Sequence, residues 1–152
     1  MRFCHASSYF LQVFESRKLD ARAQAIRDGR LVDMQRPSYR QFNEIVECHF
    51  PIAMSKAAFE QFVRLPGEHK KKAAVPANFR WGVVFLTLIE FEKHEAFSED
   101  EALFDVNVLL PDGFQVARTL KVVNDGDGED AGLIFMLPGE SAAALKQEKQ
   151  GP

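Results

Sequence analysis

The sequence has little of what marks secreted and membrane proteins. Of its 152 residues only two are cysteines, Cys4 and Cys48, which is too few for the disulfide scaffold of a small secreted domain. The longest largely apolar run, residues 83–89, falls far short of the roughly 20 residues that cross a bilayer. His5 interrupts the N-terminal residues, which do not form the apolar core of a signal peptide. We therefore expect a cytoplasmic protein with no membrane partner.

The sequence is also poor in aromatic residues that form hydrogen bonds. One Trp and two Tyr stand against 14 Phe, and Phe needs no polar partner when it is buried. With 46% hydrophobic and 27% charged residues, the composition lies in the ordinary range of globular proteins. A chain of this length can bury a sizeable core without disulfides. These properties predict a single domain over residues 1–152.

Charge is distributed unevenly along the chain. Residues 1–76 hold 13 Lys and Arg against 8 Asp and Glu, whereas residues 77–152 hold 6 against 14. The formal net charge of −3 hides this asymmetry. The two halves therefore differ in the sign of the partners that they would attract.

The first half has the spacing of amphipathic helices. Apolar residues recur at intervals of three and four from Ser8 to about Asp28, and Gly29 follows as a helix-ending residue. A second helix is expected from Ser38 to residue 48 or 49. A third is expected from Ser55, with Pro66-Gly67 at its end.

The second half has the composition of β-structure. Residues 79–92 are rich in Val, Ile, Phe and Thr on both faces, which favours a central strand covered on both sides. Further strands are expected over residues 104–110, 114–123 and 133–137. The fold class predicted is α+β, in which a mostly helical N-terminal half packs on one face of an antiparallel β-meander of about four strands. Its expected segments are a mainly helical 1–65, a basic loop 66–78, the β-meander 79–137 and a short helix or frayed tail 138–152.

In an up-and-down sheet every second turn lies at the same end of the sheet. The predicted turns 93–101 and 125–130 are separated by one other turn, so we expect them at the same end. They gather eight carboxylates, and clustered charge of one sign steers association with a partner of opposite charge. The alternatives are that these turns only keep the chain soluble, or that Asp125, Asp127 and Glu129 hold a cation. We call this set the acidic pole: Glu95, Glu99, Asp100, Glu101, Asp125, Asp127, Glu129 and Asp130.

Basic residues on the first predicted helix and in the 66–78 loop offer a rival surface. Such residues would neutralise phosphates and give salt-dependent binding to nucleic acid. The alternative is a solvated outer helix face. We call this set the basic face: Arg17, Lys18, Arg22, Arg27, Arg30, Lys70, Lys71 and Lys72.

No sequence motif points to a specific chemistry. Phosphate-binding loops, dinucleotide fingerprints and metalloprotease helices are absent, and no cofactor is expected. The two Cys-His dipeptides are weak zinc candidates because adjacent side chains point in different directions. The residues concerned are Cys4, His5, Cys48 and His49.

By elimination, the sequence favours a non-enzymatic interaction protein, either an adaptor, an inhibitor or an accessory factor. It would act as a monomer or a dimer and bind a protein partner through the acidic pole or the helical face. Two alternatives stay open. One is a nucleic-acid-associated factor that uses the basic face, and the other is an unrecognised enzyme or ligand-binding domain.

Overall fold

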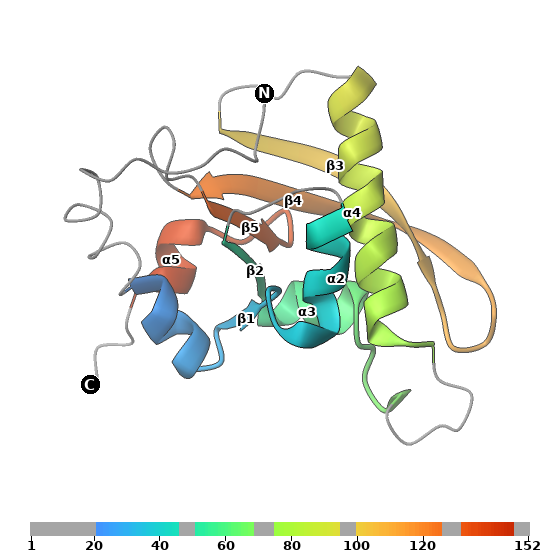
Figure 1. Ribbon diagram of the computed structural model, residues 1–152, viewed down its shortest axis with the longest axis horizontal. Helices are drawn as coiled ribbons and strands as arrows, with labels where there is room; N and C mark the ends of the chain where they lie inside the picture. The colour runs from blue at the N-terminus through green and yellow to red at the C-terminus, as the bar shows by residue number, and fades with distance from the viewer. Residues whose placement is uncertain (1–20, 46–50, 69–74, 95–99, 126–131, 148–152) are drawn as a thin grey trace.

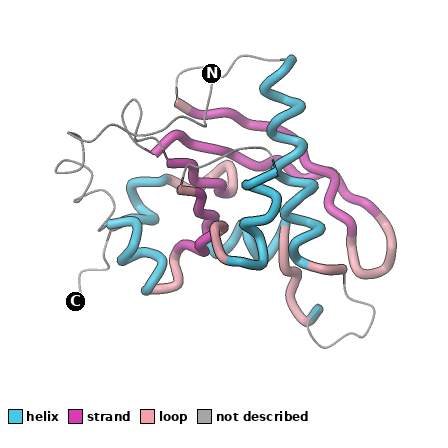
Figure 2. The backbone as a smooth tube through the Cα atoms, viewed as in Figure 1, coloured by secondary structure: helices cyan, strands magenta, loops and turns pink. Residues whose placement is uncertain are grey.

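A computed structural model describes residues 21–45, 51–68, 75–94, 100–125 and 132–147. The chain begins, within these ranges, with a helical segment at 21–27 and ends with a short helix beside it (Figures 1 and 2). The remaining elements, in chain order, are β1 (Leu31–Asp33), α2 (Pro37–Ile45), β2 (Ile52–Ser55), α3 (Lys56–Phe62), α4 (Ala77–His94), β3 (Glu101–Leu109), β4 (Gln115–Asp125), β5 (Gly132–Met136) and α5 (Ala142–Lys146).

The sheet has five strands in the order β1-β2-β5-β4-β3. β3, β4 and β5 form a three-stranded antiparallel meander, but β5 then pairs in parallel with β2, which pairs antiparallel with β1. The prediction of a purely antiparallel meander is therefore wrong, because two short strands from the first half extend the sheet into a mixed one. The fold is α+β, and its helices are not concentrated in the N-terminal half.

The second correction concerns residues 79–92, which form most of the 18-residue helix α4 and not a strand. Val, Ile and Thr favour strands only when packing suits them, and tertiary packing overrides this preference. Here Trp81, Val84, Phe85 and Leu88 point from α4 into the core. α4 is apolar on its buried side and also on much of its exposed side. For this reason the sequence resembles a strand that is apolar on both faces.

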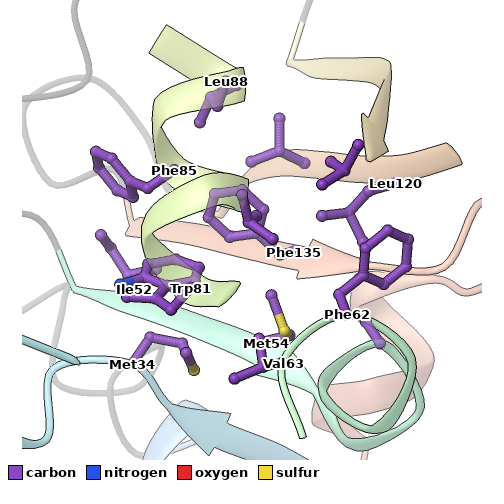
Figure 3. Packing of buried hydrophobic residues seen from close by; sticks show 14 of the residues in the cluster. Met34, Ile52, Met54, Phe62, Val63, Trp81, Phe85, Leu88, Leu120 and Phe135 are labelled. Carbon is purple, nitrogen blue, oxygen red and sulfur yellow. The ribbon is translucent and has the colours of Figure 1, made fainter. Parts of the chain in front are cut away.

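Helices cover both faces of the sheet, though not equally (Figure 1). The larger core lies between the sheet and α2, α3 and α4, where Trp81 packs edge-to-face on Phe85 and Phe135 (Figure 3). A smaller core on the other face joins Ala25 and Leu31 to Ile134 and Met136. Apart from Val123, which packs against the smaller core, the outer face of the β3–β4 hairpin lies outside both cores.

Several local expectations are confirmed by backbone geometry. Gly29 has a φ of 78°, and Arg30 N donates to Ala25 O across it, as in a helix-ending Schellman motif. Ser55 caps α3 by accepting a hydrogen bond from Ala58 N. Gly113, with a φ of 94°, turns the chain between β3 and β4.

Candidate protein-interaction surfaces

The acidic pole is only partly within the described residues. Asp100 and Glu101 are exposed, and Asn124 N donates to Asp100 O, so the start of β3 and the end of β4 meet at one end of the sheet. The other described member, Asp125, is largely buried. The remaining members lie outside the described residues: Glu95, Glu99, Asp127, Glu129 and Asp130.

Asp125 is neutralised by two cations. Arg22 Nη2 lies 3.2 Å from one carboxylate oxygen, and Lys146 Nζ from α5 pairs with the other. Burial lowers the pKa of Arg22, and the nearby carboxylate of Asp125 opposes this effect. Arg22 belonged to the predicted basic face and Asp125 to the acidic pole, so the fold uses one member of each set to neutralise the other. This cluster ties the segment 21–27 and α5 to the sheet.

The close approach of Arg22 to the sheet depends on Gly132. A Cβ added at Gly132 would lie 2.7 Å from Arg22 Cζ, so the guanidinium would have to shift to make room for it. Arg22 Nη1 is buried and has no hydrogen-bond partner among the described residues. The guanidinium is therefore held by packing and by Asp125, and it is not displayed to a phosphate.

The other described members of the basic face also have intramolecular partners. Arg30 donates to Leu145 O at 2.8 Å and to Gln147 O, at the end of α5, and pairs with Asp28. Arg27 is exposed and donates to Gln24 at 2.7 Å. The remaining members lie outside the described residues: Arg17, Lys18, Lys70, Lys71 and Lys72. Within the described ranges, Arg27 is therefore the one exposed member of the expected outer stripe, and its hydrogen bond is to a neighbouring residue of the same helical segment.

Within the described ranges no group of three or more His, Cys, Asp or Glu side chains is arranged to hold a metal ion. The weak zinc candidates Cys4, His5, Cys48 and His49 all lie outside those ranges. No described helix is both long enough and apolar enough to cross a bilayer.

A shallow groove of about 470 Å³ separates α3 from the β3–β4 hairpin. Arg118 lies at this groove and already donates to Gln61 O at 2.7 Å. The other lining residues are mostly aliphatic or proline, so the groove offers little charge. They are Ala57, Glu60, Leu65, Pro66, Leu110 and Pro111.

The outward side of α4 is the most apolar exposed feature on the described helices. Phe79, Val83, Leu86 and Glu90 are spaced by four, three and four residues, which places them on one side of an α-helix. Phe79 is 50% exposed and Leu86 52% exposed, whereas Val83 is half-buried. We call these four residues the α4 stripe. Two large apolar side chains two turns apart, with Val83 between them, form a patch of the kind that marks interaction sites.

A buried ion pair fixes the N-terminal turn of α4. Arg80 pairs with Glu68, and both residues are 2% exposed. Arg80 also donates to Leu109 O through Nε at 2.9 Å and Nη2 at 2.7 Å, and to Val63 O at 3.3 Å. This one side chain therefore joins α4 to the end of α3 and to the end of β3.

Hydrogen bonds lower the pKa of the Glu68 carboxyl group. Desolvation alone would raise its pKa, but the hydrogen bonds from Arg80 and from the backbone N–H groups of Leu65 and Val75 outweigh it. The pKa of Glu68 is held below its ordinary value. Glu68 is therefore ionised in the folded protein at neutral pH, and the charge of Arg80 is compensated.

Sequence reasoning missed both the α4 stripe and the Arg80–Glu68 pair. A signal for the first was length, since the largely apolar segment from Phe79 to Phe91 is longer than most strands. A signal for the second was Arg80 itself, a cation next to Trp81 at the start of that apolar segment.

No protein-family model, curated protein or solved structure matches this chain.

Proposed function

We propose that this chain is a protein-interaction module that binds another protein through the α4 stripe. The observation that carries the proposal is the exposure of Phe79 and Leu86 on a helix whose opposite side is in the core. Such a face suits an amphipathic helix of a partner. The apolar residues of that helix, at intervals of three and four positions, would pack between Phe79 and Leu86.

Acidic residues near the C-terminal end of α4 indicate that the partner carries basic residues. Glu90 is part of the stripe, Glu92 follows it, and Asp100 and Glu101 are exposed at the start of the next strand. A partner helix with Lys or Arg beside its apolar residues complements this arrangement. The proposal agrees with the expectation from the sequence that acidic residues select the partner. It adds an apolar surface, the α4 stripe, that contributes to the affinity.

The expected gain from the two exposed side chains follows from their area. Full burial of a Phe or Leu side chain stabilises by roughly 1.5–3 kcal/mol, so burial of the exposed half of each contributes about 1 kcal/mol or somewhat more. Phe79 and Leu86 together would then account for roughly 1.5–3 kcal/mol, or about 10- to 150-fold in affinity.

The test uses substitutions of one type at two exposed phenylalanines. The protein is used to capture a partner from an extract of its native cells, and the affinity is then measured with the purified partner. Phe79→Glu is expected to weaken binding at least about 10-fold, whereas Phe114→Glu, at the 72%-exposed tip of the β3–β4 hairpin, is expected to change it less than about twofold. Unchanged thermal midpoints show that both variants fold.

Two results would overturn the proposal. Equal binding by Phe79→Glu and the wild type would exclude the α4 stripe as the contact surface. Sedimentation that shows a wild-type dimer and a Phe79→Glu monomer would mean that the stripe is occupied by a second copy of this chain and not by a different protein.

A further inference from the structure

The outer edge of β3 has free backbone groups in a regular pattern. β3 is the last strand of the sheet, and among the described residues no strand pairs with its other edge. Asn124 N donates to Asp100 O, and Leu110 N donates to Phe114 O, so the even-numbered residues of this strand bond to β4. Hydrogen bonds alternate along an antiparallel strand, and the N–H and C=O groups of residues 101, 103, 105 and 107 therefore point away from the sheet.

Arg80 marks one end of this edge. The carbonyl of Leu109 accepts two hydrogen bonds from Arg80. Because Leu109 is an odd-numbered residue, the alternating pattern directs this carbonyl away from β4. This contact confirms which way the odd-numbered carbonyls point. It also leaves residues 101–107 as the stretch that is open to a further strand.

Within the described residues the edge lacks several of the devices that usually prevent pairing, and its only charged side chains, Glu101 and Asp105, are acidic. Exposed edge strands are commonly protected by Lys, by Pro, by a bulge or by their short length. β3 has nine residues, contains neither Lys nor Pro, and pairs with β4 in an uninterrupted register from Glu101 to Leu109. The opposite edge of the sheet, β1, is only three residues long.

We infer that the outer edge of β3 takes an extended segment of a partner protein, in which apolar residues alternate with Lys or Arg. The side chains of Glu101, Leu103, Asp105 and Asn107 are exposed on the outer face, so partner residues opposite them would lie beside Glu101 and Asp105. Basic residues fit these positions.

The alternate positions of the added strand would face α4. Spacing places residues 80, 83, 87 and 91 along one flank of that helix. At its two ends Arg80 reaches Leu109 and Phe91 contacts Phe104, so this flank runs along β3. Its middle, Val83 and Thr87, is half-buried and would be covered by apolar partner residues. The partner segment should therefore alternate basic residues, which face outward beside Glu101 and Asp105, with apolar residues, which face α4.

Charge argues against a second copy of this chain as the occupant. Antiparallel pairing of two β3 strands would bring Glu101 and Asp105 of both copies onto one outer face, and like charges on neighbouring strands are destabilising. The inference differs from the proposed function, because it rests on backbone groups of β3 and does not require the exposed side chains Phe79 and Leu86 of the α4 stripe.

The test is a titration of the full chain with three nine-residue peptides. One alternates Val and Lys, one has the same composition with Val and Lys in separate blocks, and one alternates Val and Glu. Hydrogen exchange of the amides of Leu103, Asp105 and Asn107 is followed by NMR. The alternating Val-Lys peptide is expected to slow this exchange at least about 10-fold, and the other two less than about twofold.

A pair of variants separates backbone pairing from side-chain contact. Leu103→Pro removes one outward N–H without removing a bond to β4, whereas Leu103→Ala keeps it. Leu103→Pro is expected to weaken the peptide at least about 10-fold and Leu103→Ala less than about threefold. The inference is overturned if both variants bind alike, or if the blocked and alternating Val-Lys peptides bind equally, which would show charge attraction alone. Phe79→Glu is expected to leave this binding unchanged, so the two proposals fail separately.

Discussion

The Arg80–Glu68 pair supports a quantitative prediction because it is buried and richly bonded. In Glu68→Gln the charge of Arg80 loses its counter-ion but keeps the carbonyls of Val63 and Leu109. Loss of one partner of a buried pair costs about 3–5 kcal/mol, and these retained bonds place the variant near the lower value. For a urea m-value of about 2 kcal/mol/M, the unfolding midpoint falls by about 1.5 M.

A double-mutant cycle isolates the interaction itself. Arg80→Met leaves the carboxylate of Glu68 buried and is expected to cost about 3–5 kcal/mol. The double variant with Glu68→Gln buries neither charge, so it should be at least about 2 kcal/mol more stable than the sum of the single effects implies. Urea unfolding of the four proteins measures this. Additivity within about 0.5 kcal/mol would refute the argument that the two charges depend on each other.

The same pair predicts a pH dependence with a definite sign. The pKa of Glu68 is lowered in the folded state, so its contribution is fully present above the unfolded carboxyl pKa of about 4.3. The contribution is lost as the pH falls through the lower folded value. The stability difference between the wild type and Glu68→Gln should therefore shrink below about pH 4. A difference that stays constant from pH 7 to pH 3 would contradict this assignment.

Three further predictions concern other contacts. Gly132→Ala should destabilise by about 1–3 kcal/mol because its Cβ collides with Arg22, and Arg22→Met should recover part of this loss in urea unfolding. Arg30→Met should cost about 1 kcal/mol and speed amide exchange in α5, since it removes the hydrogen bond to Leu145 O. Burial raises the pKa of Glu92, so ionisation costs stability as the pH rises above about 4.5, and Glu92→Gln should stabilise slightly at pH 7 and not at pH 4.

Local signals in the sequence predicted the α+β class and several individual turns, caps and strands, but not the sheet topology. Gly29, Ser55 and Gly113 act where their chemistry requires them, and the alternation in residues 104–110 marks a strand with one buried face. These features are decided by residues close together in the chain. They could therefore be identified without knowledge of the tertiary structure.

The errors came from features that depend on distant residues. β2 spans only Ile52–Ser55, and all four of its residues are buried, so it shows no alternation before α3 begins. α4 was mistaken for a strand because an apolar stripe on its outer side removed the amphipathic signal. The stripe that misled the sequence prediction is the same feature that supports the proposed function.

The candidate site was less predictable than the fold. The contact between Arg22 and Asp125 joins residues 103 positions apart, and no pattern in the sequence indicates that these two opposite charges cancel. The open edge of β3 follows from strand order, which depends on the parallel pairing of β2 with β5. Neither fact can be read from residue type or spacing alone.

The most direct measurement is photocrosslinking from the α4 stripe. A photoreactive phenylalanine analogue replaces Leu86 in one sample and Phe114 in another, and both are irradiated in an extract of the native cells. The proposed function predicts a crosslink to another protein from position 86 and none from position 114, with competition by the unlabelled wild type but not by Phe79→Glu. No crosslink from position 86, or the same products from both positions, would contradict it.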